Sequence, residues 1–430
     1  MNYYSLNKKA PNTSFKDAVI KGLAPDKGLY FPETITPLPQ SFFYTIDNLS
    51  HTEIAYKAIK QFVSPEIPET ILKTIIDETL SFEFPVVKLN DNISTLELFH
   101  GPTMAFKDVG ARFMARCLGY FNKDNTNEVT VLVATSGDTG GAVANGFLGV
   151  KGVNVVILYP SGKVSDIQEK QLTTLGQNIT ALEVNGTFDD CQAMVKRAFL
   201  DDTLTTKMQL TSANSINVAR WLPQLFYFMF AYKQLHNTYK NLVFSVPSGN
   251  FGNVCAGMIA QQLGLPIQHF IASNNENNVV THYLQTKKYT PKPSVQTISN
   301  AMDVGDPSNF IRIQEIYKNN FKTLKQNLSS YSFTDEETKE ALKEINNNFN
   351  YVADPHGAVG YLGCKTYLKN NPDAHCVFLE TAHPTKFLDV VEDTIGKKQE
   401  LPTQIQAIIN KTKVATVINA YDDLKKKLLN

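Results

Sequence analysis

The stretch EVTVLVATSGDTGGAVANGFLG, residues 128–149, has the pattern of a buried strand, a polar glycine turn and a helix. Its first part is a run of β-branched and aliphatic residues, as expected of a strand that is buried on both faces. A strand followed at once by a turn and a helix is the repeating unit of parallel sheets covered by helices. The stretch therefore predicts an α/β fold.

The same scheme recurs further along the chain. VNVVILYP (153–160) precedes the amphipathic segment VSDIQEKQLTTLG (164–176), and NLVFSVPSGNFGNVCAGMIAQQLG (241–264) again runs from strand through glycine turn to helix. HCVFLETAHPTKF (375–387) supplies a late strand that ends in polar residues. Residues 311–350 are rich in Lys, Asn and Glu at helical spacing, which predicts a solvent-facing helical insertion.

The chain has 430 residues, more than one hydrophobic core usually spans. Residues 1–84 mix helical stretches with proline-punctuated loops, which predicts a small leading domain. We therefore expect three domains, at residues 1–84, 85–225 and 226–430. The second should be the smaller α/β domain and the third the larger one with the insertion.

Composition excludes several classes of function. Lys+Arg and Asp+Glu both number 41, so no basic surface for nucleic acid is expected. The first residues contain no apolar segment typical of a signal peptide, and the longest aromatic run, WLPQLFYFMFAY, is too short to cross a bilayer, which predicts a cytoplasmic protein. The five cysteines form no CxxC pair, which indicates buried thiols and neither a metal site nor a disulfide framework. The sequence leaves monomer and dimer open.

Lys107 stands out in LELFHGPTMAFKDVGARFMARCL, residues 96–118. It follows the breakers His100, Gly101 and Pro102 and the apolar Phe106, at the start of a helical pattern, rather than on a charged face. A buried lysine has a lowered pKa, so its amine is free to attack an aldehyde. The alternative is an ordinary lysine with its stem against apolar surface or in a salt bridge.

Two glycine turns are candidate anion sites. PSGNFGNVCAG and ATSGDTGGAVANG each follow a buried strand and precede a helix, where backbone N–H groups and the helix dipole attract negative charge. Taken singly, each turn is equally well an ordinary tight turn with a polar N-cap. A phosphate held by one such loop, together with a desolvated lysine, is the arrangement that holds pyridoxal phosphate as a Schiff base.

Motifs along the whole chain then resemble a known family. HGPTMAFKDVGARF, TSGDTGG and SGNFGN resemble the fold-type II pyridoxal-phosphate enzymes, and within them the threonine synthases that have a long N-terminal domain. The start, YYSLNKKAPNTSFKDAVIKGLAPDKGLYFPE, and the later NAMDVGDPSNF, ADPHGAVGY and ETAHPTKF are similar to that family's blocks in the same order. The resemblance implies a fold like that of the tryptophan synthase β subunit, with two open twisted α/β sheets and a small N-terminal domain.

The resemblance also implies roles for individual residues in holding the cofactor. Lys107 matches the Schiff-base lysine, which also transfers protons. Thr381, at the end of the strand CVFLET, matches the hydroxyl that meets the pyridine nitrogen, where the alternative is a simple strand-end cap. The residues that match the cofactor-phosphate loop are Gly249, Asn250, Phe251, Gly252 and Asn253.

Substrate-binding residues follow in the same way. In TSANSINVARW, Asn214 and Arg220 resemble the site for the substrate phosphate, which a guanidinium can grip with two hydrogen bonds. The alternative for Arg220 is a surface cation stacked on Trp221. The loop expected to face the substrate carboxylate contributes Thr135, Ser136, Asp138 and Thr139. Asp138, as a carboxylate near the cofactor, should have a proton or a cation beside it.

The implied reaction converts O-phospho-L-homoserine and water to L-threonine and phosphate, with pyridoxal phosphate as cofactor. A lyase of the same fold that forms 2-oxobutanoate is one alternative, because no motif decides where water attacks. A binding protein that has lost turnover is another. Lys107, Asn253, Arg220 and Thr381 are all present, which argues against the loss of turnover.

Overall fold

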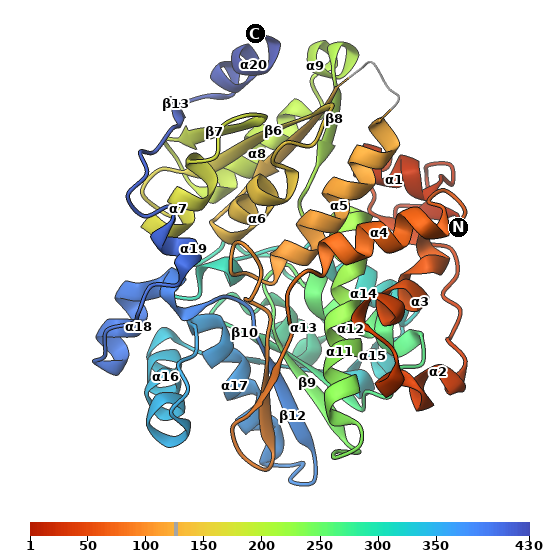
Figure 1. Ribbon diagram of the computed structural model, residues 1–430, viewed down its shortest axis with the longest axis vertical. Helices are drawn as coiled ribbons and strands as arrows, with labels where there is room; N and C mark the ends of the chain where they lie inside the picture. The colour runs from red at the N-terminus through yellow and green to blue at the C-terminus, as the bar shows by residue number, and fades with distance from the viewer. Residues whose placement is uncertain (124–127) are drawn as a thin grey trace. The chain divides into compact units, whose positions relative to one another are not determined.

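The computed structural model describes residues 1–123 and 128–430, which form two compact units. Unit 1 comprises residues 1–31, 107–220 and 401–430, and unit 2 comprises residues 32–106 and 221–400. Each unit contains a mainly parallel sheet flanked by helices, as the ribbon shows (Figure 1). The prediction of an α/β fold with two open sheets is confirmed.

The sheet of unit 1 has five strands in the order β13-β7-β6-β5-β8, and every neighbouring pair is parallel. The strands are β5 (Val129–Ala134), β6 (Val153–Pro160), β7 (Ile179–Val184), β8 (Gln209–Ser212) and β13 (Thr416–Ile418). The stretch that predicted the fold thus forms β5, a turn and α6. Parallel strands place all their carboxyl ends at one edge of the sheet, where ligands of open α/β sheets collect.

Helices connect and cover these strands. They are α5 (Lys107–Asn122), α6 (Asp138–Phe147), α7 (Asp166–Thr173), α8 (Phe188–Ala198), α9 (Asp202–Lys207), α10 (Val218–Trp221), α19 (Thr403–Gln406) and α20 (Tyr421–Leu429). Capping boxes start α7 at Ser165 and α8 at Thr187. Leu132, Leu158 and Leu182 of three adjacent strands pack with residues of α8 and α20 in one core.

The first 31 residues belong to unit 1. They form β1 (Tyr3–Ser5), α1 (Phe15–Lys21) and the start of β2 (Tyr30–Pro32). The ring of Phe15 lies 6.1 Å from that of Phe121 on α5, and Thr211 on β8 donates a 3.1 Å hydrogen bond to the carbonyl of Val19. These contacts explain why the leading segment packs with residues that follow it by more than a hundred positions.

The sheet of unit 2 has six strands in the order β11-β10-β9-β12-β4-β3. All neighbours are parallel except β3 and β4, which are antiparallel. The strands are β3 (Val86–Lys88), β4 (Ile93–Glu97), β9 (Leu242–Pro247), β10 (His269–Asn274), β11 (Leu328–Ser332) and β12 (His375–Glu380). In Figure 1 the green β9 lies beside the blue β12, although they are far apart in sequence.

Helices cover this sheet too. They are α2 (Gln40–Tyr44), α3 (His51–Val63), α4 (Glu69–Thr79), α11 (Leu225–Leu235), α12 (Gly252–Gln262), α13 (Val279–Thr286), α14 (Phe310–Ile316), α15 (Phe321–Asn327), α16 (Asp335–Phe349), α17 (Pro355–Leu368) and α18 (Leu388–Ile395). Short 3₁₀ helices are η1 (Ile46–Asn48), η2 (Leu222–Gln224), η3 (Asn300–Met302) and η4 (Pro384–Phe387). Helix α17 packs closely on β9, β10 and β12 because glycines face the strands: a Cβ at Gly363 would lie 2.0 Å from the Ser273 hydroxyl.

Two expectations about organisation differ from the structure. Residues 311–350 are not purely helical, because Leu328–Ser332 forms the edge strand β11, which pairs with β10 between α15 and α16. The two compact units also divide the chain differently from three consecutive domains at 1–84, 85–225 and 226–430. The reason is that residues 1–31 and 401–430 pack with the sheet of unit 1, whereas residues 32–106 pack with that of unit 2.

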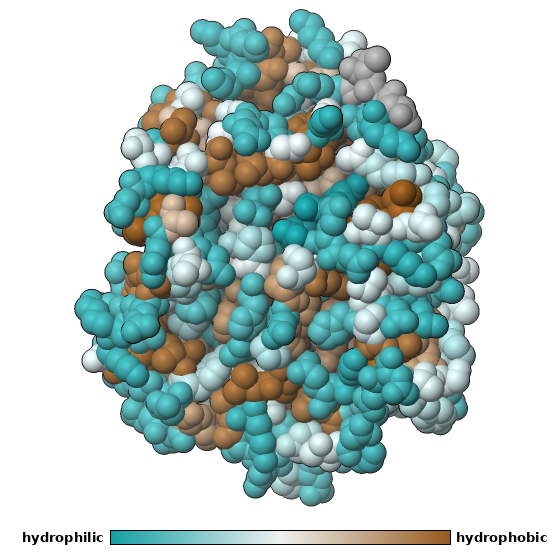
Figure 2. Space-filling view, viewed as in Figure 1, coloured by the Kyte–Doolittle hydropathy of each residue, from teal (hydrophilic) through white to brown (hydrophobic). Residues whose placement is uncertain are grey.

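The face drawn in Figure 2 carries mostly hydrophilic side chains with small apolar areas between them. Apolar side chains that are well exposed include Leu200 and Val414. In the part of the chain that the structure describes, no helix combines the length and the apolar character that crossing a membrane requires.

Candidate active site

Helix α5 of unit 1 begins at Lys107, whose side chain is partly rather than fully buried. One turn later, Gly110 lies against Arg220: a Cβ at position 110 would come within 2.5 Å of the Arg220 carbonyl oxygen and 3.2 Å of its Nε. Any larger residue at 110 would push α5 and α10 apart. The glycine therefore lets the helix that carries Lys107 run beside Arg220.

Arg220 is almost completely buried, with 2% of its surface exposed. Its Nη1 donates a hydrogen bond to the carbonyl of Ala213, on the loop that follows β8. Because Arg220 is buried, it is not a surface cation, and the Trp221 ring has the guanidinium of Arg312 4.4 Å from its centroid. A buried guanidinium of this kind is typical of a group that binds an anion or a carbonyl edge.

The turn after β5 is organised by the Thr135 hydroxyl. This hydroxyl accepts hydrogen bonds from the N–H groups of Gly137 (3.0 Å) and Gly140 (2.8 Å). Gly137 has a φ of +140°, and a Cβ there would overlap the Gln168 side chain at 2.4 Å, so only glycine fits. Ser136 and Thr139 are less buried than Thr135. The structure thus shows Thr135 holding the turn together, and its contact with substrate stays a prediction.

Asp138 is the first residue of α6 and is buried. Its Oδ1 accepts a 3.0 Å hydrogen bond from Nε2 of Gln168 on α7. The capping residue of α6, Gly137, offers no side-chain acceptor, and the Thr135 hydroxyl instead accepts from the Gly140 N–H in the first turn. An amide donor thus lies beside this carboxylate, and the proton or cation expected beside it stays a prediction.

Asn214 follows β8 and links two strand ends. Its Nδ2 donates a 3.0 Å hydrogen bond to the carbonyl of Ala134, the last residue of β5. Because β5 and β8 are parallel neighbours, Asn214 and the turn at Thr135–Asp138 lie at the same sheet edge. The structure therefore brings together, within unit 1, the residues predicted to bind substrate.

In unit 2, β9 leads into the predicted phosphate loop and then into α12. Phe251 caps α12 in the left-handed conformation, with φ +61°, and offers no side-chain cap. The N-terminal amides of this eleven-residue helix are thus turned toward the loop. Asn253 donates a 2.7 Å hydrogen bond from Nδ2 to the Pro247 carbonyl, and Asn250 Oδ1 accepts one of 2.6 Å from the Ser308 N–H.

Gly249 gives this loop its closest packing. A Cβ at position 249 would lie 2.7 Å from Cα of Met302 and 2.9 Å from the carbonyl oxygen of Ala301, both in η3. Real side chains do not tolerate these distances, so only glycine allows η3 to pack here. The short helix η3 thus sets the position of the loop from behind.

Thr381 directly follows β12 and is 5% exposed. Its carbonyl accepts a 2.9 Å hydrogen bond from the N–H of Phe106, the residue before Lys107. Its hydroxyl has no hydrogen-bond partner in residues 1–123 and 128–430, so the hydroxyl is available to a ligand atom. The alternative of a strand-end cap is not what the structure shows.

Residues 103–106, which we call the strap, directly precede Lys107 and are held along their length. Ala105 forms an antiparallel bridge with Ala382, and the His383 N–H donates a 3.1 Å hydrogen bond to the carbonyl of Met104. Within unit 2, the strap thus runs beside the segment that carries Thr381.

Two further side chains donate hydrogen bonds to the strap. The Nζ of Lys386, which has no exposed surface, donates a 2.9 Å hydrogen bond to the Thr103 carbonyl, and the Tyr227 hydroxyl donates one to the Phe106 carbonyl. Sequence reasoning missed both residues. The signal for Lys386 was a lysine two residues after the strand-end motif ETAHP, whereas Tyr227 had none, because it lies in an aromatic run.

His383 contacts the strap through its backbone N–H. Burial, together with the charge of His100, lowers the pKa of His383 to about 4. Its Nδ1 accepts a 3.2 Å hydrogen bond from the Thr385 N–H, which suits a neutral ring. At neutral pH this histidine therefore contributes no positive charge next to the strap.

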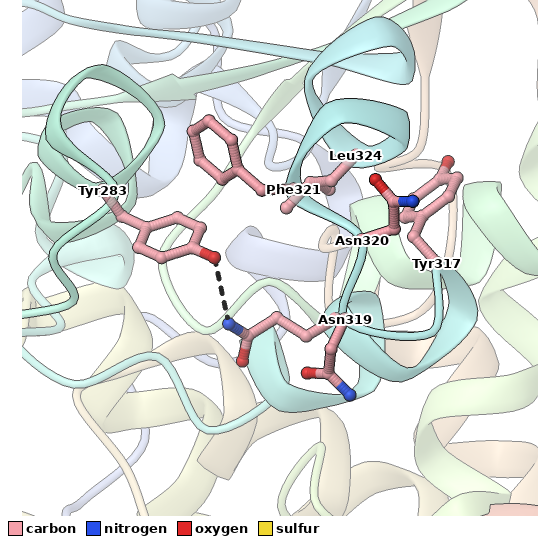
Figure 3. A pocket seen from close by; sticks show the side chains of 7 residues that line it. Tyr283, Tyr317, Asn319, Asn320, Phe321 and Leu324 are labelled. Atoms are coloured by element: carbon pink, nitrogen blue, oxygen red, sulfur yellow. Dashed lines mark hydrogen bonds between the residues drawn. The ribbon is translucent and has the colours of Figure 1, made fainter.

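The pocket drawn in Figure 3 is not the site. It is lined by Tyr283, Tyr317, Phe321 and neighbouring residues of α13 to α15, where Gln314 donates a 3.5 Å hydrogen bond to the Tyr283 hydroxyl. Its cavity volume of about 10 Å³ lies far below the roughly 300–1,000 Å³ typical of small-molecule sites. None of the predicted site residues lines it.

The predicted residues thus fall into two sets, each grouped by the fold of its own unit. Unit 1 holds Lys107, Thr135, Ser136, Asp138, Thr139, Asn214 and Arg220. Unit 2 holds Gly249, Asn250, Phe251, Gly252, Asn253 and Thr381. Both sets lie next to carboxyl ends of parallel strands, the edge at which open α/β sheets bind ligands.

Known proteins resemble the chain over its whole length. Three family models match it: "Pyridoxal-phosphate dependent enzyme" over residues 88–381, "Threonine synthase N terminus" over 2–80 and "Threonine synthase, C-terminal" over 357–427. Threonine synthase of Buchnera aphidicola subsp. Baizongia pistaciae is 44% identical over 100% of both chains.

Solved structures agree with these matches. The crystal structure of threonine synthase from Escherichia coli has a TM-score of 0.94 and 40% identity, and covers 100% of both chains. A PLP-bound threonine synthase from Brucella melitensis has a TM-score of 0.92 and 32% identity over 100% of this chain and 98% of that one.

Proposed function

Because this chain belongs to the threonine synthase family of pyridoxal-phosphate dependent enzymes, we propose that it converts O-phospho-L-homoserine and water to L-threonine and phosphate, the last step of threonine biosynthesis. The observation that carries the proposal is the end-to-end similarity to threonine synthases, which includes the N-terminal and C-terminal segments specific to them. A general pyridoxal-phosphate enzyme would match the central segment alone.

The residues present fit pyridoxal 5′-phosphate as the cofactor. The amides at the start of α12 and the close approach allowed by Gly249 suit its phosphate. Lys107 supplies the amine for its aldehyde, and the open hydroxyl of Thr381 suits its ring nitrogen. A hydroxyl, unlike a carboxylate, does not hold that nitrogen fully protonated, so proton positioning by the chain contributes more to the reaction.

Arg220 and Asn214 are proposed to bind the phosphate of the substrate. A guanidinium can donate two parallel hydrogen bonds to phosphate oxygens, and Gly110 lets Arg220 run beside the helix of Lys107. Ser136 and Thr139 offer hydroxyls for the substrate carboxylate, and the positive end of the α6 dipole favours a negative charge there. The substrate is thus proposed to be held at both of its anionic ends.

The bound cofactor supplies an electron sink that makes the protons near the substrate amine acidic. Lys107 is proposed to take the proton from Cα and to return protons later. A second deprotonation, at Cβ, expels phosphate from Cγ, and Arg220 with Asn214 stabilise the charge that develops on the leaving group. A proton is then added at Cγ, water adds to Cβ and Cα regains its proton. The sum is one water consumed and one phosphate released.

The first experiment assays the purified protein with O-phospho-L-homoserine and measures phosphate, threonine, 2-oxobutanoate and ammonium. The proposal requires threonine in equal amount to phosphate. Equal 2-oxobutanoate and ammonium would show a lyase instead. Binding of substrate without phosphate release would show a binding protein.

A second experiment tests Lys107. Borohydride reduction of the cofactor-loaded protein should attach the cofactor to Lys107, as peptide mapping can establish, and Lys107→Ala should lose both this label and phosphate release. Lys365→Ala, which removes a lysine bound to Glu344, serves as the matched control and should keep both. A label on another lysine would refute the assignment.

We also propose that the protein works in the cytoplasm on a small molecule and binds neither nucleic acid nor membrane. All five cysteines are free and buried, as is typical of a reducing compartment. The equal numbers of acidic and basic residues give no net positive charge to attract phosphodiesters. Cell fractionation with an antibody to the chain tests the location.

A further inference from the structure

Two acidic side chains are completely buried behind the segment that carries Thr381. Asp354 caps the start of α17, Glu380 is the last residue of β12, and neither has any exposed surface. The Asp354 N–H donates a hydrogen bond to Oε1 of Glu380, so the two residues are in direct contact. The charge of Asp354 also acts on Glu380, and two buried acids that interact in this way cannot both be ionised without a large cost in free energy.

The hydrogen-bond donors around the pair show which acid carries the charge. The oxygens of Asp354 accept hydrogen bonds from the backbone N–H of His356 (2.7 Å), from its Nδ1 and from the N–H of Ala382 (3.3 Å). Oε2 of Glu380 has no hydrogen-bond donor in the residues described, and a Cβ at Gly357 would lie only 1.7 Å from it. Asp354 is therefore the ionised member and Glu380 keeps its proton.

The electrostatics agree with this assignment. Burial, together with the negative charge of Asp354, raises the pKa of Glu380 well above its usual range. A protonated Glu380 can donate to the Asp354 carboxylate, as a carboxylate–carboxylic acid pair does. Other titratable groups around the pair are Glu97, which binds Tyr351 and His100, together with Asp303 and His383.

His356 connects the acid pair to the phosphate loop. Its Nε2 accepts a 3.2 Å hydrogen bond from the Ala301 N–H, which requires the proton of the neutral ring to lie on Nδ1, facing Asp354. Ala301 and Met302 in turn form the surface on which Gly249 packs. A continuous chain of contacts thus leads from Asp354 to the proposed phosphate loop.

The other end of the cluster holds Thr381. Asp354 accepts from the N–H of Ala382, the residue after Thr381, and Glu380 is the residue before it. The Glu380 carbonyl also accepts a 3.0 Å hydrogen bond from the Leu98 N–H. The backbone on both sides of Thr381 is therefore fixed, so the direction of its hydroxyl depends on the acid pair.

We propose that Asp354, His356 and Glu380 form a positioning cluster, in which Asp354 is ionised and Glu380 is protonated. The cluster fixes the positions of Thr381 and of the Gly249 loop relative to each other, so that both can bind the same cofactor molecule. The inference rests on the proposed function, because it assigns these two elements to the ring end and the phosphate end of pyridoxal phosphate. None of the three residues needs to touch the cofactor.

The first experiment compares two amide variants by titrating each protein with pyridoxal phosphate and recording its visible spectrum. Glu380→Gln mimics a protonated acid, since the amide can still donate to Asp354, and should keep the dissociation constant within about twofold of the original. Asp354→Asn removes the charge that His356 and Ala382 bind, and should weaken binding by about tenfold or more. Equal losses in both variants would overturn the assignment of the proton.

The second experiment separates the two ends of the cofactor. His356→Asn can still donate to Asp354 but no longer reaches the Ala301 N–H, so the phosphate loop alone should loosen. Binding of pyridoxal phosphate should weaken about tenfold, while binding of pyridoxal, which has no phosphate, should stay the same. A loss that is equal for both ligands would overturn the proposed link to the loop, because a general structural defect does not distinguish them.

Controls keep these outcomes interpretable. Glu344→Gln changes another acid, which binds Tyr361 and Lys365 on α17, and should leave both dissociation constants unchanged. Circular dichroism and urea unfolding show whether each variant folds, and if Asp354→Asn does not, the His356→Asn comparison decides alone. If the unaltered protein does not bind pyridoxal phosphate, the proposed function fails, whereas binding that no variant alters overturns only the cluster.

Discussion

Arg220 is the residue whose chemistry is most specific to the proposed substrate. Arg220→Lys keeps the positive charge but loses the planar fork, so the KM for O-phospho-L-homoserine should rise by about tenfold or more. The visible spectrum of the bound cofactor should not change, because the variant leaves the phosphate loop and Lys107 intact. Steady-state kinetics and absorbance measure the two effects.

The matched control is Arg197→Lys on α8, whose guanidinium lies over the Tyr421 ring 4.0 Å from its centroid. This variant should have the original KM. An unaltered KM in Arg220→Lys, with normal turnover, would mean that the leaving phosphate binds elsewhere.

Thr381 allows a test of a single hydroxyl. Thr381→Val keeps the volume but removes the proposed hydrogen bond to the ring nitrogen, so kcat should fall about tenfold and the cofactor spectrum should shift. Thr381→Ser restores the hydroxyl and should recover most of both. If Val and Ser variants behave alike, the hydroxyl does not meet the cofactor.

At the scale of single residues, the sequence indicated which side chains belong to the site but not their hydrogen-bond partners. Lys107, Arg220 and Thr381 were predicted from their motifs, whereas the role of Lys386 depends on the Thr103 carbonyl, 283 positions earlier in the chain. Glu380 likewise reads as the polar end of a strand, and only the fold places Asp354 beside it. Pairings this distant cannot be inferred from one sequence.

At the scale of elements, the strap at residues 103–106 is held on one side by the segment of Thr381 and on the other by α11. Tyr227→Phe removes the hydrogen bond to the Phe106 carbonyl, directly before Lys107. We expect the free energy of unfolding to fall by about 1 kcal/mol and kcat to fall severalfold, because the backbone at Lys107 gains freedom. Urea unfolding and phosphate release measure these effects.

Tyr44→Phe on α2 is the control, because Tyr44 is 77% exposed and its hydroxyl donates a long hydrogen bond of 3.4 Å to Gln40. Neither quantity should change in it. A Tyr227→Phe variant that is destabilised yet fully active would show that the strap matters for folding alone.

The elements themselves were predicted unevenly. Residues 128–149 form the expected strand, turn and helix because a buried parallel strand is a continuous apolar run. The strand β11, Leu328–Ser332, was missed because LSSYS has no such run and stands between two segments with helical spacing. Its strand conformation comes from pairing with β10, which is a tertiary contact.

For the molecule as a whole, stability should depend on His269. This ring is buried between the Gln326 carbonyl and the Ser329 hydroxyl, and burial lowers its pKa to about 4. The unfolded chain protonates it near 6.5, so the folded state is fully stabilised above that pH and loses stability as the pH falls toward 4. The total loss from this one residue is about 3 kcal/mol.

His269→Asn, whose amide can still donate to the Gln326 carbonyl, should therefore flatten the fall in unfolding free energy between pH 6.5 and 4. Urea denaturation at several pH values measures the slope. His282→Asn, at a partly exposed position on α13, is the control and should keep the original slope. An unchanged slope in His269→Asn would mean that this ring is protonated in the folded protein.

The division of the chain also belongs to this scale. Composition and periodicity change near residue 85, which predicted a domain boundary there, but packing groups residues 32–106 with 221–400. The amphipathic pattern of a helix shows that one of its faces is buried, but it does not show which sheet buries that face. The pairing of β13 with β7 is equally invisible in the local sequence of Thr416–Ile418.

This pairing sets an order of events during translation. Strand β13 leaves the ribosome only after residues 221–400. The edge of β7 in the nascent sheet of unit 1 therefore stays uncovered while that part of unit 2 is synthesised. Until the last thirty residues arrive, that bare edge is a target for chaperones and for pairing with neighbouring nascent chains.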